Sequence, residues 1–381
     1  MTRRQATAWS WSAITFVIVM AALGALVQRY TNHLAAKVET NFGDQPDPAG
    51  VKEFLGALEH PLFSGAAPEV MANAKGRDTF LYRAADRAHR EVYGTPFKLW
   101  DQGAAGTCVS FGWGLGIYLG AAVDWTQGEL AKPPLLVSTE NIYGGSRTLG
   151  RLPPVKAAGY VDGSYGAAAA RYVKGLKSGR GGILFRQKYG DVDLTEYSIS
   201  LSRQWGNSGV PDALAVEANV HTAREVALCD SWDSLCAALE NGLCVPVCSD
   251  VGFEGSGRVR DAEGFLKRGG NWGHCMCVIG VRYAKNGSSR DGVLIANSWF
   301  PAWVKGPRWP ADMPEGSFWC SRQDIEAILR QSDSFVVGGV HGFAARDLDH
   351  GAWFEPAPAP AAAARRPQPA SIIAGIYSLS P

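Results

Sequence analysis

Residues 101–114 read DQGAAGTCVSFGWG, a glycine-rich turn that leads into an apolar run. Gly103 and Gly106 permit a tight turn with close backbone approach. The continuation VSFGWGLGIYLGAAV predicts an apolar helix whose first turn contains Cys108. A helix N-terminus lowers the pKa of a thiol, so Cys108 is a candidate nucleophile. A buried cysteine that merely begins a core helix fits the same pattern, and this stretch alone does not separate the two readings.

A histidine begins a second apolar run. The stretch GGNWGHCMCVIGVRY, residues 269–283, predicts a strand that emerges from a glycine-rich loop at His274. Side chains alternate between the two faces of a strand, so His274 points away from Cys275 and Cys277. A histidine at the mouth of a strand is placed to face a cleft and act as a base, although a structural histidine of the core fits this pattern too.

An asparagine ends a third predicted strand, within GVLIANSWF at residues 292–300. The amide of Asn297 is suited to accept the ring N–H of a histidine, which fixes the tautomer and the orientation of the ring. The large side chain of Trp299 is suited to shield that hydrogen bond from water. The alternative is an asparagine in a turn beside a core tryptophan.

The order of these motifs resembles the papain-like cysteine peptidases. The resemblance covers residues 98–343 and rests on DQGAAGTCVSF, GHCMCVIGV, IANSWFPAW and EGSFWC, in that order. It implies that Cys108 is the nucleophile, that His274 is its base and acid, and that Asn297 orients the histidine. It further implies two donors to the oxyanion, namely the side chain of Gln102, six residues before the cysteine, and the backbone N–H of Cys108.

The sequence departs from this family at several points. Val109 follows the cysteine where the family usually has an aromatic residue. The cysteine and the histidine are 166 residues apart, which exceeds the family's usual separation of roughly 130–150. The glycine pair with which the family binds the substrate backbone corresponds to DGSYG, residues 162–166. By this resemblance the candidate substrate-binding residues are Gly163, Ser164, Tyr165 and Trp299. The departures indicate a divergent member of bacterial or phage type.

The distribution of elements predicts an α+β fold. The first half of the main domain is mainly helical and the second half is mainly β, which favours two subdomains with a cleft between them; the resemblance implies the papain-like version, with an antiparallel sheet. We expect a peptidase domain over residues 96–345, preceded by a stalk and packing helix, or a divergent pro-region, over 31–95. A Pro/Ala-rich tail follows over 346–381.

The N-terminal segment, residues 1–30, predicts a membrane anchor or a signal peptide. Arg3 and Arg4 precede AITFVIVMAALGALV, and the stretch from Gln5 to Gln28 carries no charge. Basic residues favour the cytoplasmic side, which places the catalytic domain outside the cytoplasm. An uncleaved transmembrane helix and a secreted or periplasmic domain released by cleavage near ALGA both remain open.

Charge and cysteine spacing narrow the possible partners. The net charge is +1, with 37 basic and 36 acidic residues in 381, which indicates no nucleic-acid partner. The chain has eight cysteines but no C-x-x-C pair, so neither a zinc ribbon nor a thioredoxin-like site is indicated. We expect no metal and no other cofactor. The oligomeric state is not predicted by these patterns.

The combined prediction is thiol-dependent hydrolysis of peptide bonds through an acyl-thioester on Cys108, with a protein or peptide as substrate. Two alternatives stay open. One is a non-catalytic papain-fold protein that binds peptides or assembles at the envelope. The other is a cell-wall amidase or transpeptidase, in which the same acyl-thioester is transferred to a different acceptor.

Overall fold

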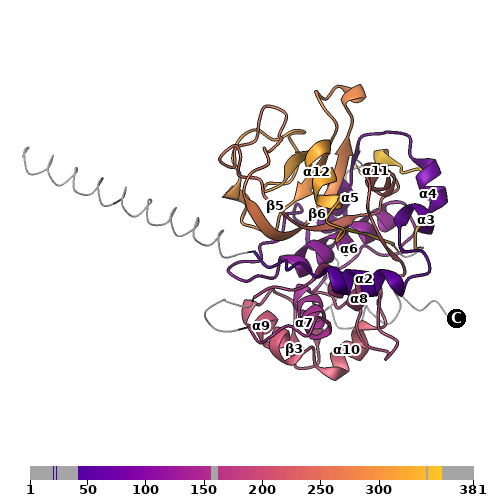
Figure 1. Ribbon diagram of the computed structural model, residues 1–381, viewed down its shortest axis with the longest axis vertical. Helices are drawn as coiled ribbons and strands as arrows, with labels where there is room; N and C mark the ends of the chain where they lie inside the picture. The colour runs from indigo at the N-terminus through magenta and orange to yellow at the C-terminus, as the bar shows by residue number, and fades with distance from the viewer. Residues whose placement is uncertain (1–19, 21–22, 24–41, 156–161, 340–341, 354–381) are drawn as a thin grey trace, which may run out of the picture.

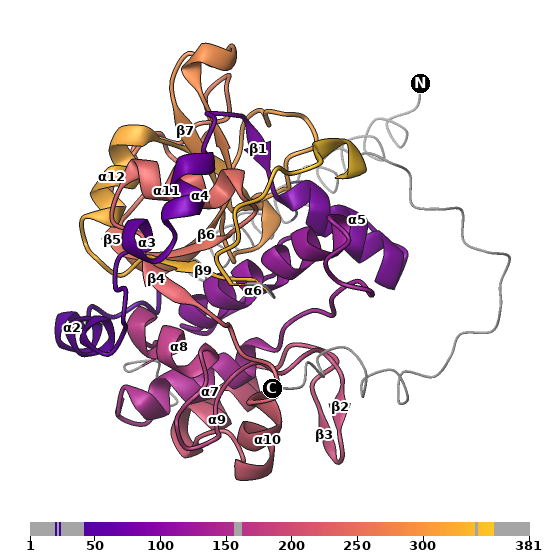
Figure 2. The ribbon, with the colours of Figure 1, turned by 90° about the vertical axis from the view of Figure 1, so that its right-hand side faces the viewer.

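A central helix separates two groups of elements in the computed structural model of the chain (Figures 1 and 2). The structure describes residues 20, 23, 42–155, 162–339 and 342–353. The central helix is α6 (Cys108–Thr126), and it begins at the cysteine that the sequence singles out. Most of the predicted N-terminal segment, 1–30, and the tail from residue 354 onward lie outside the described residues. Among the residues that are described, no helix has the length and apolar character needed to cross a membrane.

The first group is helical and follows α6 in the chain. Its helices lie together on one side of α6 (Figure 2). They are α7 (Thr139–Leu149), α8 (Gly166–Val173), α9 (Ile199–Ser208) and α10 (Asp212–Ala218). A small hairpin of β2 (Lys188–Tyr189) and β3 (Val192–Asp193) projects from this group.

The second group is built on an antiparallel sheet. Its longest strand is β6 (Asn271–Arg282), which pairs with β5 (Val245–Val251), β1 (Thr79–Phe80) and β7 (Gly292–Ala296). β7 in turn pairs with β8 (Phe318–Ser321). A separate two-stranded sheet joins β4 (Val226–Leu228) to β9 (Phe335–Val337). The helices of this half are α11 (Trp232–Glu240) and α12 (Arg322–Leu329), with short turns η1 (Ala284–Asn286), η2 (Pro301–Trp303) and η3 (His350–Trp353).

The segment before the central helix contributes to both groups. It contains α2 (Pro48–Gly56), α3 (Phe63–Ala66), α4 (Pro68–Asn73) and α5 (Tyr82–Tyr93). α5 is amphipathic and buries Tyr82, Ala84, Ala85 and Ala88. It packs along α6, and α2 lies beside α8. The described part of residues 31–95 is therefore packed against both the central helix and the helical group.

The central helix lies directly on the sheet because small residues face β6. A Cβ atom on Gly112 would lie 2.9 Å from Cys275 Sγ and 3.0 Å from Met276 O, so any side chain there would push α6 away from the strand. Cys275 and Cys277 thus face α6, and His274 lies on the opposite face of β6, as the alternation of strand side chains predicts. This packing brings the N-terminus of α6 next to the start of β6.

Candidate active site

Cys108 occupies the first turn of α6 and is fully buried. Residues from other segments of the chain hydrogen-bond to the turn that precedes Cys108. The backbone N–H of Gly106 donates to Asp162 Oδ2 at 2.9 Å. The Tyr197 hydroxyl lies 3.0 Å from Thr107 Oγ1 and donates to the carbonyl of Gln102 at 3.2 Å. The N–H groups of a first helical turn have no partner within the helix, so the backbone N–H of Cys108 is available to an incoming oxygen.

His274 and Asn297 form a hydrogen-bonded pair. His274 is on β6, Asn297 directly follows β7, and the two strands are neighbours. The distance from His274 Nε2 to Asn297 Oδ1 is 2.7 Å. The ring of Trp299 lies over the histidine, with centroids 4.7 Å apart and planes inclined by 31°. His274 Nδ1 is buried and has no hydrogen-bond partner among the described residues. The amide therefore holds the ring by one nitrogen and leaves the other for a different group.

Gln102 is locked in place beside this pair. Its backbone N–H donates to Ser298 O at 2.8 Å, and its side-chain Oε1 accepts from Ser298 Oγ at 2.5 Å. Its Nε2 donates to Ala105 O at 2.7 Å, within the turn that leads to Cys108. Since Ser298 follows Asn297 in the chain, the glutamine ties the cysteine turn to the strand end that carries the asparagine.

Burial disfavours the charged forms of both candidate catalytic groups, Cys108 and His274. Burial lowers the pKa of His274 to about 4, against a smaller opposing effect of the Asn297 hydrogen bond. Burial raises the pKa of the Cys108 thiol well above its ordinary value, as do the nearby Cys275 and Asp44, while hydrogen bonds from the backbone of Cys275 and Gly43 oppose this. In this conformation a neutral thiol and a neutral imidazole are therefore favoured over an ion pair.

The stretch of chain just before α2 covers the site. Residues 42–47, here called the strap, run between the two halves of the molecule. On the sheet side, the N–H groups of Gly43 and Asp44 both donate to Gly273 O at 3.0 Å. On the helical side, the N–H of Ser164 donates to Gly43 O at 2.8 Å and the N–H of Gln45 donates to Ser164 O at 3.1 Å. The strap thus bridges the residue before His274 and the residue that begins the turn into α8.

Close contacts at the strap leave no room for larger residues. A Cβ atom on Gly43 would lie 2.0 Å from the carbonyl oxygen of Gly106, two residues before Cys108. The ring of Phe42 packs on those of His274 and Trp299, with centroid distances of 6.0 and 5.6 Å. The strap therefore covers both the cysteine turn and the histidine.

The structure brings His274, Asn297 and Trp299 into direct contact and ties Gln102 to Ser298, the residue after Asn297. Of the predicted substrate-binding residues, Ser164 pairs with the strap through its backbone N–H and C=O. Gly163 supplies a carbonyl that accepts from Arg147, and Tyr165 precedes α8 as its N-terminal cap residue. The sequence motifs did not single out Phe42 or Gly43, because their contacts depend on where the segment lies and not on a recognisable pattern.

One buried cluster of potential ligand atoms adjoins the strap. Asp44, Cys248 and Asp333 offer an oxygen or sulfur each, all within 4.8 Å of one another. The Cys248 thiol donates to the Asp44 carboxyl. All eight cysteines are free and buried. The cluster connects the strap to β5 and to the loop before β9.

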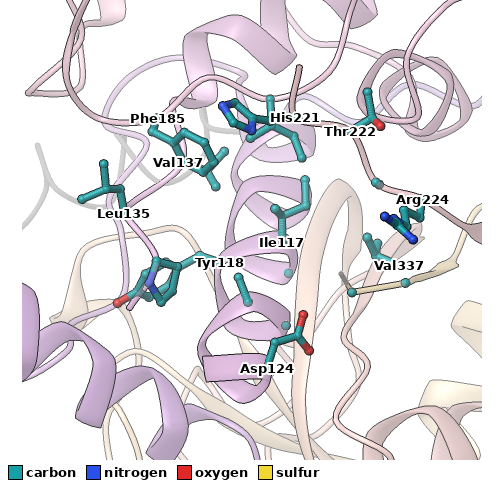
Figure 3. A pocket seen from close by; sticks show the side chains of 18 of the residues that line it. Ile117, Tyr118, Asp124, Leu135, Val137, Phe185, His221, Thr222, Arg224 and Val337 are labelled. Carbon is teal, nitrogen blue, oxygen red and sulfur yellow. The ribbon is translucent and has the colours of Figure 1, made fainter. Parts of the chain in front are cut away.

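A cavity lies away from the predicted site residues. It measures about 270 Å³ and is lined by α6 residues such as Ile117, together with Phe185, His221 and Val337 (Figure 3). Asp124, also on α6, is paired with Arg346 at 2.9 Å. None of the predicted site residues lines this cavity.

Comparison with solved structures defines the class of fold: it is that of the papain-like cysteine proteases. The structure is similar to xylellain, a cysteine protease from Xylella fastidiosa, with a TM-score of 0.50, 18% sequence identity, and coverage of 79% of this chain and 97% of that chain. The predicted α+β class and papain-like architecture are confirmed.

Two further solved structures are also similar. Procathepsin B of Trypanosoma congolense has a TM-score of 0.45 and 14% identity, covering 80% of this chain and 87% of that chain. Digestive procathepsin L 3 of Tenebrio molitor has a TM-score of 0.40 and 15% identity, covering 80% and 86%. A scan against protein-family models and a search of curated proteins found no match.

Proposed function

We propose that the chain is a papain-type cysteine peptidase that hydrolyses peptide bonds at Cys108. The observation that carries this proposal is the 2.7 Å hydrogen bond between His274 and Asn297 under the ring of Trp299. It fixes the imidazole by Nε2 and leaves Nδ1 for proton transfer. The cysteine supports the proposal because it begins α6 and lies against the backbone of Cys275, the residue after the histidine.

The proposed reaction is acyl transfer in two steps. Cys108 transfers its proton to His274, and the thiolate attacks the carbonyl carbon of the scissile peptide bond. The backbone N–H of Cys108 and the Gln102 side chain stabilise the oxyanion. His274 protonates the amine that leaves, and then takes a proton from the water that hydrolyses the thioester and releases the thiolate. Asn297 holds the ring in one orientation through both steps.

The proposal includes latency: the described conformation is a covered form, and the strap must leave before a substrate binds. The strap occupies backbone groups on both sides of the site, namely Gly273 O and the N–H and C=O of Ser164. A substrate chain cannot use these groups while the strap does. Burial under the strap also favours neutral Cys108 and His274, so the covered form is unreactive as well as blocked.

We expect the substitution Gly43→Ala to activate the enzyme. The new Cβ meets a backbone carbonyl at 2.0 Å, which a rotamer change cannot relieve, so the strap is displaced. Overpacking of this kind typically costs about 1–3 kcal/mol, which corresponds to roughly 5- to 150-fold faster modification of Cys108. The measurement is the rate of labelling by an irreversible peptidyl epoxide, with the modified residue mapped among the eight cysteines.

The matched control for this experiment is Gly56→Ala. Gly56 ends α2, and a Cβ atom there meets nothing within 4 Å, so labelling should keep the rate of the unmodified chain.

In the unmodified chain we expect the covered form to be more stable at low pH. Burial and the neighbouring Asp333 hold the pKa of Asp44 well above its usual range, so protonation of Asp44 stabilises the covered form at low pH, and this stabilisation is lost as the pH rises. Labelling spread over several cysteines would refute the assignment of Cys108 as the nucleophile. An unchanged labelling rate in Gly43→Ala would refute the proposed latency.

We also propose that the catalytic domain lies outside the cytoplasm. Arg3 and Arg4 ahead of the uncharged apolar run support this orientation. Protease added to intact cells, or to spheroplasts if an outer envelope is present, should digest the domain beyond about residue 35. Complete protection until lysis would contradict this orientation. An N-terminus near Leu26 in the purified protein would indicate cleavage in place of anchoring.

A further inference from the structure

A cavity beside the strap contains a buried carboxylate that the proposed reaction does not use. The cavity measures about 430 Å³ and lies between the strap and α2 on one side and β5 and the loop before β9 on the other. Its lining includes Asp44 from the strap, Cys248 and Ser249 from β5, and Asp333 from the loop. The cavity therefore lies next to the strap and to Gly273, the residue before His274.

Asp333 is fixed at the wall of this cavity. Its backbone C=O accepts from the N–H of Cys248 at 3.3 Å, which ties it to β5. Its carboxyl group accepts hydrogen bonds from the backbone N–H groups of Gly166 and Ala167, at the start of α8. The residue is only 8% exposed, yet Oδ1 has no hydrogen-bond partner among the described residues. A polar atom held in this way lacks the partner that a buried carboxylate requires.

The strap shows how a peptide reaches this carboxylate. Asp44 lies opposite Ser164 in a parallel bridge, with its neighbours Gly43 and Gln45 bonded to the Ser164 backbone. Asp44 in that position lines the cavity, and its carboxyl group lies within 4.8 Å of that of Asp333. The residue opposite Ser164 in any extended peptide has the same access.

The strap lines the cavity with a side chain of the wrong charge, that of Asp44. Two facing carboxylates repel each other, and burial together with Asp333 raises the pKa of Asp44, so this occupant is held best when a proton is shared. Of the charged residues that line the cavity, Asp44, Asp47 and Lys52 belong to the strap and α2, and the other two, Asp250 and Asp333, are both acidic. Lys52 on α2 also lines the cavity and is exposed. A cation is the partner that this wall lacks.

Building on the proposed peptidase function, we infer that Asp333 determines specificity and binds a lysine or arginine side chain of the substrate. The basic residue would be the one whose backbone lies against Ser164. Its charged group would donate to Asp333 Oδ1 in a charge-assisted hydrogen bond, while the other carboxylate oxygen stays bonded to the start of α8. Release of the strap thus removes Asp44 and exposes a pocket matched to basic peptides.

The test compares matched peptidyl epoxides on the full chain. They carry lysine, the near-isosteric norleucine, or glutamate at each position in turn, and the measured quantity is the rate of modification of Cys108. At one position we expect lysine to react at least about tenfold faster than norleucine, because hydrogen bonds to charged groups contribute roughly that factor or more. The strap lowers all rates by the fraction of covered molecules, so the ratio between peptides is independent of it.

Variants distinguish a specific contact with Asp333 from a general electrostatic attraction of the domain for basic peptides. Asp333→Asn should bring the lysine-to-norleucine ratio close to one, and Asp333→Glu should retain a preference for lysine. Asp250→Asn, which removes an exposed carboxylate at the rim of the same cavity, should leave the ratio unchanged. If Asp333→Asn does not fold, the ratios of the unmodified chain and of Asp333→Glu still decide the question.

Failure of the specificity inference can be distinguished from failure of the peptidase proposal. If neutral peptides modify Cys108 but lysine gives no advantage at any position, or the advantage survives in Asp333→Asn, the specificity inference is wrong and the peptidase proposal stands. If no peptide modifies Cys108 even in the Gly43→Ala variant, the peptidase proposal is wrong and the inference falls with it.

Discussion

Replacing His274 with alanine is expected to reduce peptide hydrolysis as severely as Cys108→Ala does, by roughly 10⁵- to 10⁶-fold, the scale at which a nucleophile or its base fails in a catalytic triad. The imidazole is the group proposed to take the thiol proton and to protonate the leaving amine. Without it, neither acylation nor deacylation has a proton carrier. The measurement is turnover of a fluorogenic peptide in the Gly43→Ala background, in which we expect the strap to be displaced.

The double variant supplies the control. Because both residues act on the same step, His274→Ala combined with Cys108→Ala should be no slower than either alone. Asn297→Ala should retain part of the rate, because it loosens the ring without removing it. Circular dichroism and thermal melting must show folded protein in each case. If His274→Ala keeps most of its activity, the assignment of the base is wrong.

The proposed catalytic dyad and its orienter could be predicted from the sequence because each part depends on local structure. Glycines before an apolar run place Cys108 at the N-terminus of α6. A glycine-to-strand junction places His274 at the start of β6, and a strand end places Asn297 on the neighbouring strand. The sheet then needs only adjacent pairing of β6 and β7 to bring the histidine and the asparagine to 2.7 Å. The roles of these residues stay predictions until they are tested.

The strap was not predictable in the same way. It pairs through backbone N–H and C=O groups, which every residue carries, so its sequence holds no mark of where it binds. Gly43 fits the cysteine turn only because Gly106 O lies 2.0 Å from where its Cβ would be, a distance set by tertiary packing. Asp333 is likewise ordinary in sequence. Its burial against α8 and its position near Asp44 arise from three segments that are distant in the chain.

Gln102 is expected to contribute to turnover and to stability at once, and the two effects are separable. Its amide is held between the cysteine turn and the strand end by Ala105 O and Ser298 Oγ. Loss of one oxyanion donor typically costs on the order of 100- to 1000-fold in turnover, or about 3–4 kcal/mol. Gln102→Ala in the Gly43→Ala background should slow acylation by that factor, with little change in the binding of the substrate.

The matched variant is Ser298→Ala, which removes the hydrogen bond to Gln102 Oε1 but leaves the amide nitrogen in place. Both variants should lower the melting temperature, since each leaves a buried polar group without its partner, at about 1–3 kcal/mol. Only Gln102→Ala should lose turnover by the larger factor once rates are expressed per folded molecule. Small-molecule alkylation of Cys108 should continue in both, because thiolate formation depends on His274 and the α6 N-terminus. Equal turnover losses in the two variants would mean that Gln102 only braces the turn and has no place at the oxyanion.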